Sequence, residues 1–183
     1  MQTPLYRKRN RNKMLVLASL LCIPILFFSS LTVAKTIQDI KAAYLYNFIK
    51  FINWPDSESR DVFNLCILGE DPINEKLHLL NNRPVRQAKL YVKKIPQINA
   101  NEHCQVLFIG ESEKKFINTI VNNNQEGAVL TVSSVEDFVV QGGIIGFITL
   151  GNIIRFDINL KQARQTHLSI SSKLLELANR VEK

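Results

Sequence analysis

Apolar residues in this sequence occur partly as short continuous runs and partly as longer stretches with helical spacing, and the two patterns alternate along the chain. Continuous apolar runs at residues 62–68 and 106–109 predict strands that are buried on both faces. Residues 89–95 alternate between apolar and polar and predict another strand, and residues 128–132 predict one more. Strands separated by helical stretches are typical of a mostly parallel sheet.

The longest helical stretch begins at Lys35 or Thr36 and ends at Trp54-Pro55, because proline disfavours a helical backbone in the residue before it. Its apolar positions form two stripes that together cover more than the ~100° arc of an ordinary surface helix. We therefore expect this helix to be buried on most sides or to contact another chain. The stripes consist of Ile37, Ile40, Tyr44, Phe48 and Phe51, and of Ala42, Leu45, Ile49 and Ile52.

Four further helices are expected, and the last of them has an interruption near residues 168–170. The first three start next to side chains that can cap a helix N-terminus, namely Asp71, Ser112 and Ser134. The four expected helices are residues 72–80, 112–121, 135–140 and 160–181.

A β-hairpin is predicted late in the chain. Gly142-Gly143 turns the chain into a strand at 144–150, and Gly151-Asn152 is a two-residue connection to a strand at 153–158. The sequence therefore predicts an α/β fold: a single domain with a mostly parallel sheet, flanked by helices, and a late antiparallel hairpin.

Residues 1–34 have the three-part layout of a secretory signal peptide. Five basic residues precede an apolar run of about 15 residues from Met14 to Phe28, which is shorter than the ~20 that a transmembrane helix needs. Small residues at Thr32 and Ala34 predict cleavage after Ala34, export to the periplasm and a mature domain at residues 35–183. An uncleaved membrane anchor is the alternative interpretation.

Removing this segment changes the charge balance. The whole chain carries 23 basic and 16 acidic residues, a net charge of +7, but all five charges of the leader are positive. The mature chain is left with a net charge of +2, so its composition does not indicate a nucleic-acid partner.

Two cysteines remain in the mature chain, Cys66 and Cys104, and each lies beside an apolar strand-like run. An even number of cysteines in an exported protein favours a disulfide, although two buried free thiols are equally compatible with packing. In the chain-entropy model, a loop of this length would stabilise the fold by roughly 4 kcal/mol.

Residue patterns that carry catalysis are missing from the sequence. It has no phosphate-binding glycine loop, and His78, His103 and His167 do not have metal-ligand spacing. Gly110-Glu111-Ser112 lacks the second glycine of a nucleophile elbow. We therefore expect no enzyme activity, no cofactor and no metal.

Two apolar segments are candidates for binding another protein. In the first helix, Tyr46, Ile49 and Ile52 are a possible dimer or partner surface. Near the C-terminus, the candidates are Arg155, Phe156, Ile158 and Asn159. The alternative for the second segment is a local cluster of ion pairs, with Asn159 capping the last helix.

Several blocks of the sequence resemble the YfiR family of bacterial periplasmic regulators. The two most specific are Tyr44-Leu45-Tyr46-Asn47-Phe48 with Trp54-Pro55, and Arg155-Phe156-Asp157-Ile158-Asn159. All the blocks occur in order and together span nearly the whole mature chain: residues 43–55, 63–69, 103–109, 129–133, 142–159 and 169–175.

The resemblance implies a non-enzymatic repressor. Members of this family bind the periplasmic sensor region of an inner-membrane diguanylate cyclase and hold it inactive, which lowers cyclic di-GMP and biofilm formation. An OmpA-type outer-membrane lipoprotein can sequester the repressor, and members can form homodimers. The resemblance also implies a disulfide between Cys66 and Cys104, whereas a second cysteine pair that some members carry is absent here. The alternative function is that of a periplasmic small-molecule binding protein.

Overall fold

The structure is a computed structural model that describes residues 35–55, 61–98, 102–123 and 127–183. The expected signal peptide and its cleavage site lie outside the described residues. No helix within these ranges is both long enough and apolar enough to cross a membrane. The helices are α2 (Ile37–Phe51), α3 (Asn74–His78), the 3-10 helix η3 (Glu111–Phe116), α4 (Ile117–Asn122), α5 (Leu160–Gln165) and α6 (Ser172–Leu177).

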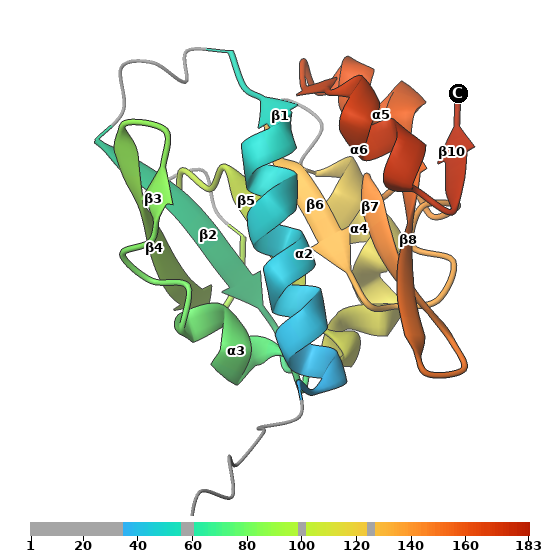
Figure 1. Cartoon of the computed structure of the whole chain (residues 1–183), viewed down its shortest axis with the longest axis horizontal. Coiled ribbons are helices and arrows are strands. Elements are labelled where there is room, and N and C mark those ends of the chain that lie inside the picture. The colour runs from blue at the N-terminus through green and yellow to red at the C-terminus, as the bar shows by residue number, and fades with distance from the viewer. Residues whose placement is uncertain (1–34, 56–60, 99–101, 124–126) are drawn as a thin grey trace, which may run out of the picture. The chain divides into compact units, whose positions relative to one another are not determined.

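Eight strands form one mixed sheet in the order β10-β8-β7-β6-β5-β2-β4-β3, and β1 and β9 form a separate antiparallel pair. Strands β4, β2, β5, β6 and β7 run parallel, and β7 and β8 form the antiparallel hairpin (Figure 1). The predicted fold class is confirmed. The strands are β1 (Ile52–Asn53), β2 (Val62–Leu68), β3 (Pro84–Val85), β4 (Ala88–Ile95), β5 (Val106–Ile109), β6 (Leu130–Ser133), β7 (Ile145–Leu150), β8 (Ile153–Asn159), β9 (Ser169–Ile170) and β10 (Arg180–Glu182).

Helix α2 covers one face of the sheet, and η3 and α4 cover the opposite face (Figure 1). Thr36 caps α2 with a capping box, in which its hydroxyl accepts from the Asp39 amide at 3.2 Å. Buried Phe48 of α2 packs against the hairpin, with ring centroids 5.7 Å from Phe147 and 4.8 Å from Phe156. This aromatic cluster fixes which face of the hairpin lies against the core.

The first helix is shorter than predicted. It ends at Phe51, and Ile52, which we assigned to an apolar stripe of the helix, instead pairs with Ile170 in the β1–β9 ladder. The hydrogen bonds of that ladder come from a segment more than a hundred residues away, so the local spacing could not indicate them.

Two predicted N-caps have other partners. The Ser112 hydroxyl accepts from the Glu70 amide at 2.9 Å, and the segment around it is η3 rather than the start of an α-helix. The Ser134 hydroxyl accepts from Lys41 Nζ at 3.0 Å. The helix expected at 135–140 is wrong, because this segment is a series of turns in which Asp137 has a φ of 56°.

The predicted helices at 72–80 and 160–181 are also wrong in extent. The first is reduced to the five residues of α3, because the Asp71 carboxylate accepts from the Ile73 amide and forms a turn. The second is divided into α5, β9, α6 and β10. The Thr166 hydroxyl donates to carbonyls of the preceding turn, and His167 has a φ of 59°, which ends α5.

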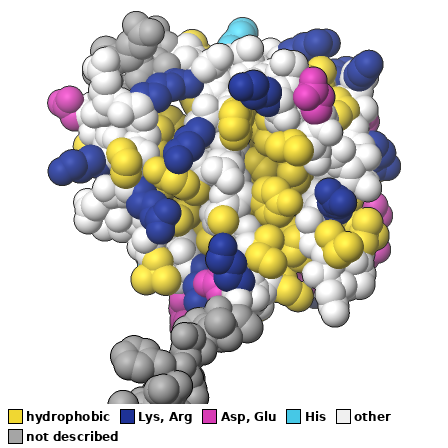
Figure 2. Space-filling model, viewed as in Figure 1, with side chains coloured by type: hydrophobic (Ala, Val, Ile, Leu, Met, Phe, Trp, Pro, Cys, Tyr) yellow, Lys and Arg dark blue, Asp and Glu magenta, His cyan; other side chains and the backbone are white. Residues whose placement is uncertain are grey.

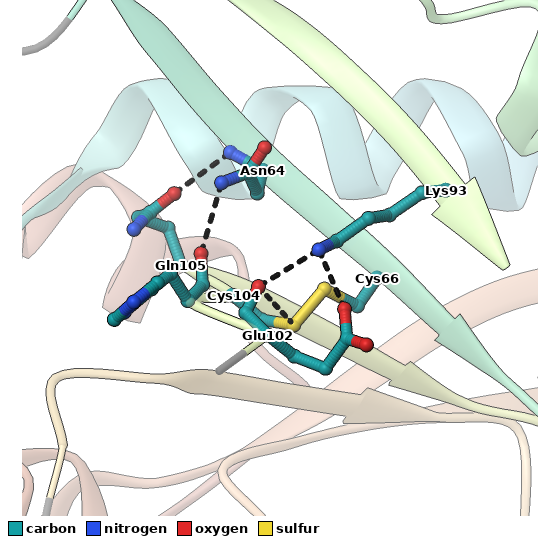
Figure 3. Close-up of polar contacts among 7 residues, drawn as sticks. Asn64, Cys66, Lys93, Glu102, Cys104 and Gln105 are labelled. Carbon is teal, nitrogen blue, oxygen red and sulfur yellow. Dashed lines mark hydrogen bonds and ion pairs between the residues drawn. A yellow bond between two sulfur atoms is a disulfide. The ribbon is translucent and has the colours of Figure 1, made fainter. Parts of the chain in front are cut away.

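A disulfide joins Cys66 of β2 to Cys104, just before β5, with Cα atoms 5.8 Å apart. The segment that carries Cys104 is tied to both neighbouring strands (Figure 3). Asn64 donates from its backbone to Gln105 Oε1 at 2.7 Å, and Lys93 Nζ donates to Glu102 Oε2 at 2.6 Å. The disulfide therefore closes the connection between β2 and β5 beside the centre of the sheet.

We predict that replacing both cysteines, Cys66→Ala with Cys104→Ala, lowers the free energy of unfolding by about 4 kcal/mol, because the unfolded chain loses the constraint of a closed loop. Chemical denaturation of the oxidised proteins measures the difference. Dithiothreitol should shift the midpoint of the wild type and leave that of the double variant unchanged. Equal midpoints for the two oxidised proteins would contradict the prediction.

Candidate protein-binding surface

The order of the parallel strands defines where a ligand would normally bind. In chain order, the five parallel strands β4-β2-β5-β6-β7 run 2-1-3-4-5, with the chain reversing direction between β2 and β5. In open α/β sheets of this kind, ligands bind outside the carboxyl ends of the strands at this reversal. Here that position lies between the loops that follow Leu68 and Ile109.

The two loops close this position against each other. The Gly110 amide donates to the Leu68 carbonyl at 2.7 Å, and the Ser112 amide donates to the Glu70 carbonyl at 3.1 Å. A Cβ atom on Gly110 would lie 2.7 Å from the Glu70 carbonyl oxygen, so the backbones touch. What remains is an open depression lined by Glu70, Asp71, Pro72, Glu111 and Ser112.

The surroundings of this depression shift the pKa values of two of its acids in opposite directions. An ion pair with Lys94 lowers the pKa of Glu70. Burial raises the pKa of Asp71, whose Oδ2 is buried and has no hydrogen-bond partner. The Ser112 hydroxyl donates to Glu113 Oε1 at 3.0 Å. Within the described ranges, no group of three or more His, Cys, Asp or Glu side chains could hold a metal ion.

A second hollow lies on the face opposite α2, beside the disulfide. It is a cleft of about 720 Å³ whose lining includes Cys104, His103, Glu113 and the exposed ring of Phe116. Its size falls in the range of small-molecule pockets.

Of the four predicted partner-binding residues near the C-terminus, only Arg155 is exposed. Phe156 and Ile158 are 1% and 0% exposed, because alternate residues of β8 face the α2-side core. Asn159 is buried: its Oδ1 accepts from the Gln162 amide at 2.8 Å and so caps α5. The alternative prediction, a local cluster of ion pairs, also matches a contact in the structure, because Arg180 Nη2 lies 3.0 Å from Asp157 Oδ2.

The three helix residues proposed as a dimer or partner surface also lie in the core. Tyr46, Ile49 and Ile52 are all buried, and the Tyr46 hydroxyl donates to the Pro84 carbonyl at 2.7 Å. The wide apolar arc of α2 therefore reflects burial against the sheet and its neighbours. These side chains present no surface to a partner in this structure.

Apart from Arg155, the sequence analysis missed the residues of the hairpin that face outward. In the β7–β8 register, Ile148 lies opposite Arg155 and Leu150 lies opposite Ile153. Leu150 and Ile153 are 54% and 57% exposed. We call these four residues the hairpin surface. The sequence does contain a pattern that indicates them. If Ile154, Phe156 and Ile158 face the core, the alternation of side chains along a strand places Ile153 and Arg155 on the outer face.

The face that carries α2 also exposes apolar side chains, which gather there among lysines and arginines (Figure 2). Half-buried apolar side chains at the border of the α2-side core include Ile40, Tyr44, Phe51 and Leu175. Apolar surface of this kind, bordered by charge, is typical of protein-binding sites.

Comparisons with known proteins identify the family and support the fold. A family model described as YfiR/HmsC-like matches residues 38–179. No curated protein sequence matches the chain. The crystal structure of a conserved domain protein from Vibrio cholerae O1 biovar eltor str. N16961 is similar, with a TM-score of 0.53, 12% sequence identity and 80% of this chain covered. The match spans 60% of that protein, and the likeness is one of fold.

We predict that Asp71→Asn stabilises the protein at neutral pH. Because the folded state raises the pKa of Asp71, the ionised carboxylate destabilises the fold, and this effect grows as the pH rises above the ordinary value of 3.8. Thermal unfolding should show a higher midpoint for the variant at pH 7 and equal midpoints near pH 3. A lower midpoint for the variant at pH 7 would contradict the prediction.

Proposed function

Because the chain belongs to the YfiR/HmsC-like family, we propose that it is a periplasmic repressor that binds the periplasmic region of an inner-membrane diguanylate cyclase and holds it inactive. The family consists of periplasmic regulators rather than enzymes. The observation that carries the proposal is the family match over residues 38–179, which is nearly all of the mature chain. Export would use residues 1–34, with cleavage after Ala34.

The closed strand ends support a function in protein binding. The usual ligand position of this fold is occupied by the backbones of Glu70 and Gly110, whereas apolar side chains are exposed on the hairpin. Leu150 and Ile153 are anchors of the kind that fill a pocket on a partner, and Arg155 beside them would add charge specificity. We therefore propose that the hairpin surface contacts the periplasmic region of the cyclase.

Repression of this kind is a shift between two populations of the cyclase. The repressor must bind the inactive form more tightly, and moving the cyclase from almost fully active to almost fully inactive takes ~5.5 kcal/mol of differential binding. Burying a few apolar anchors supplies energy of this order. An OmpA-type outer-membrane lipoprotein that competes for the repressor would release the cyclase, and a homodimer is compatible with this scheme.

A second candidate function, small-molecule binding, is favoured by the cleft beside Cys104. A ligand bound there would lie on the opposite side of the sheet from α2. In that case, a repressor assay would show an effect only when the ligand is present.

We predict that deleting the gene raises cellular cyclic di-GMP and biofilm mass, because the cyclase is released from inhibition. Cyclic di-GMP is measured in extracts of the deletion strain and of the same strain carrying the gene on a plasmid. The plasmid should return the level to that of the wild type. An unchanged level after deletion would refute the repressor function.

We predict that Leu150→Asp and Arg155→Glu each abolish the plasmid's ability to lower cyclic di-GMP, with a loss of at least tenfold in affinity for the cyclase's periplasmic region. Both side chains are exposed, so the thermal unfolding midpoint should stay near that of the wild type. Leu79→Asp is the matched control, because Leu79 is 70% exposed and lies at the end of α3, outside the hairpin surface. Full repression by both hairpin variants would remove this surface from the proposal.

A further inference from the structure

Strand β7 continues beyond its neighbour in the sheet. β6 pairs with β7 only at Ile145 and Gly146, opposite Val132 and Ser133. From Phe147 to Leu150, β8 is the one strand beside β7 among the described residues. One edge of β7 is therefore open over four residues.

The register shows which backbone groups point to the open side. The Asn159 amide donates to the Ile144 carbonyl at 2.8 Å, and Leu150 lies opposite Ile153 across the two-residue turn. Antiparallel pairs alternate between bonded and non-bonded, so even-numbered residues of β7 bond to β8. Thr149 belongs to a non-bonded pair, and its N–H and C=O point away from β8 into the open side.

The two outermost strands of the sheet are protected from pairing, but this segment of β7 is not. β3 is the dipeptide Pro84–Val85, which lacks one backbone N–H, and β10 is the short charged segment Arg180–Glu182. Proline, charge and shortness are the usual means of blocking an exposed edge. Residues 147–150 are Phe, Ile, Thr and Leu, with no proline and no charge.

A groove of about 360 Å³ begins at this open edge and extends across the outer face of the hairpin. It is lined by residues 134–139, which leave the sheet after β6, by Gly146 to Thr149 of β7, and by Asp157 of β8 and Arg180 of β10. Glu136 and Asp137 are exposed on the first of these segments. A third acid in the lining, Asp157, forms an ion pair with Arg180 at 3.0 Å. Among the residues that the structure describes, Glu136 and Asp137 form no ion pair, so the uncompensated negative charge of the groove comes from residues 134–139.

We propose that an extended segment of the cyclase's periplasmic region adds to the sheet as a strand beside β7, bonded to the backbone of Thr149 and presenting a basic side chain to Glu136 and Asp137. Main-chain bonds supply affinity in this mode of recognition, and side chains on the groove walls supply specificity. A second copy of this chain fits less well, because pairing through the same edge would bring residues 145–150, which contain no basic side chain. The inference rests on the proposed function and adds the mode of binding.

The decisive comparison is between Thr149→Pro and Thr149→Val in the deletion strain. Proline removes the outward N–H without removing a bond of the β7–β8 ladder, whereas valine keeps the N–H and changes only the side chain. We expect Thr149→Pro to leave cyclic di-GMP at the level of the deletion strain and Thr149→Val to restore the wild-type level. Circular dichroism and thermal unfolding of the two purified variants check that both fold.

The possible outcomes separate this inference from the proposed function. Repression by both variants, with the wild type active, would overturn the strand addition and leave the repressor function intact. Failure of the wild-type gene itself to lower cyclic di-GMP would refute the repressor function.

Hydrogen exchange on the full mature chain gives a second, direct measurement. The Thr149 amide should exchange rapidly in the free protein and at least tenfold more slowly after saturation with the purified periplasmic region of the cyclase. Glu136→Lys with Asp137→Lys should weaken that complex at least tenfold without changing exchange in the free protein. A Thr149 amide that stays fast in the saturated complex, or that is already slow because a second copy covers the edge, would overturn the inference.

Discussion

The contact between Phe48 of α2 and the aromatic rings of the hairpin decides which surfaces of this protein are available. Phe147 and Phe156 lie opposite each other on β7 and β8, and both pack on Phe48. Because side chains of a strand alternate between faces, fixing these two rings inward fixes Ile148 and Arg155 outward. Burial of the aromatic rings therefore determines which side chains of the hairpin are exposed as well as which lie in the core.

The parts of the fold that the sequence predicts well are those whose signal is local. Continuous apolar runs correctly indicate β2 and β5, and the Gly151-Asn152 turn correctly indicates the β7–β8 hairpin. The order of the strands has no local signal, since it depends on which strands meet after the chain has crossed the sheet. The expected helix at 160–181 fails for a related reason, because pairing with β1 and β8 draws its residues into β9 and β10.

The candidate site was harder to predict than the fold. The sequence analysis selected the segment around Arg155 as a partner surface, but the structure places Phe156 and Ile158 in the core and uses Asn159 to cap α5. Residue type alone does not distinguish an apolar side chain that is buried from one that is exposed. What separates Ile153 from Ile154 is the face of β8 on which each lies, and that is settled by the packing of the whole hairpin.

The contact between the Glu70 and Gly110 loops has a consequence for how small effectors can reach this protein. In doubly wound folds that bind nucleotides or flavins, the gap between the two diverging loops is the binding site. Here contact between the two main chains closes the gap itself and leaves the open depression lined by Glu70, Asp71, Pro72, Glu111 and Ser112. A small effector that binds at the strand ends would therefore rest on the outside of the two loops rather than between them.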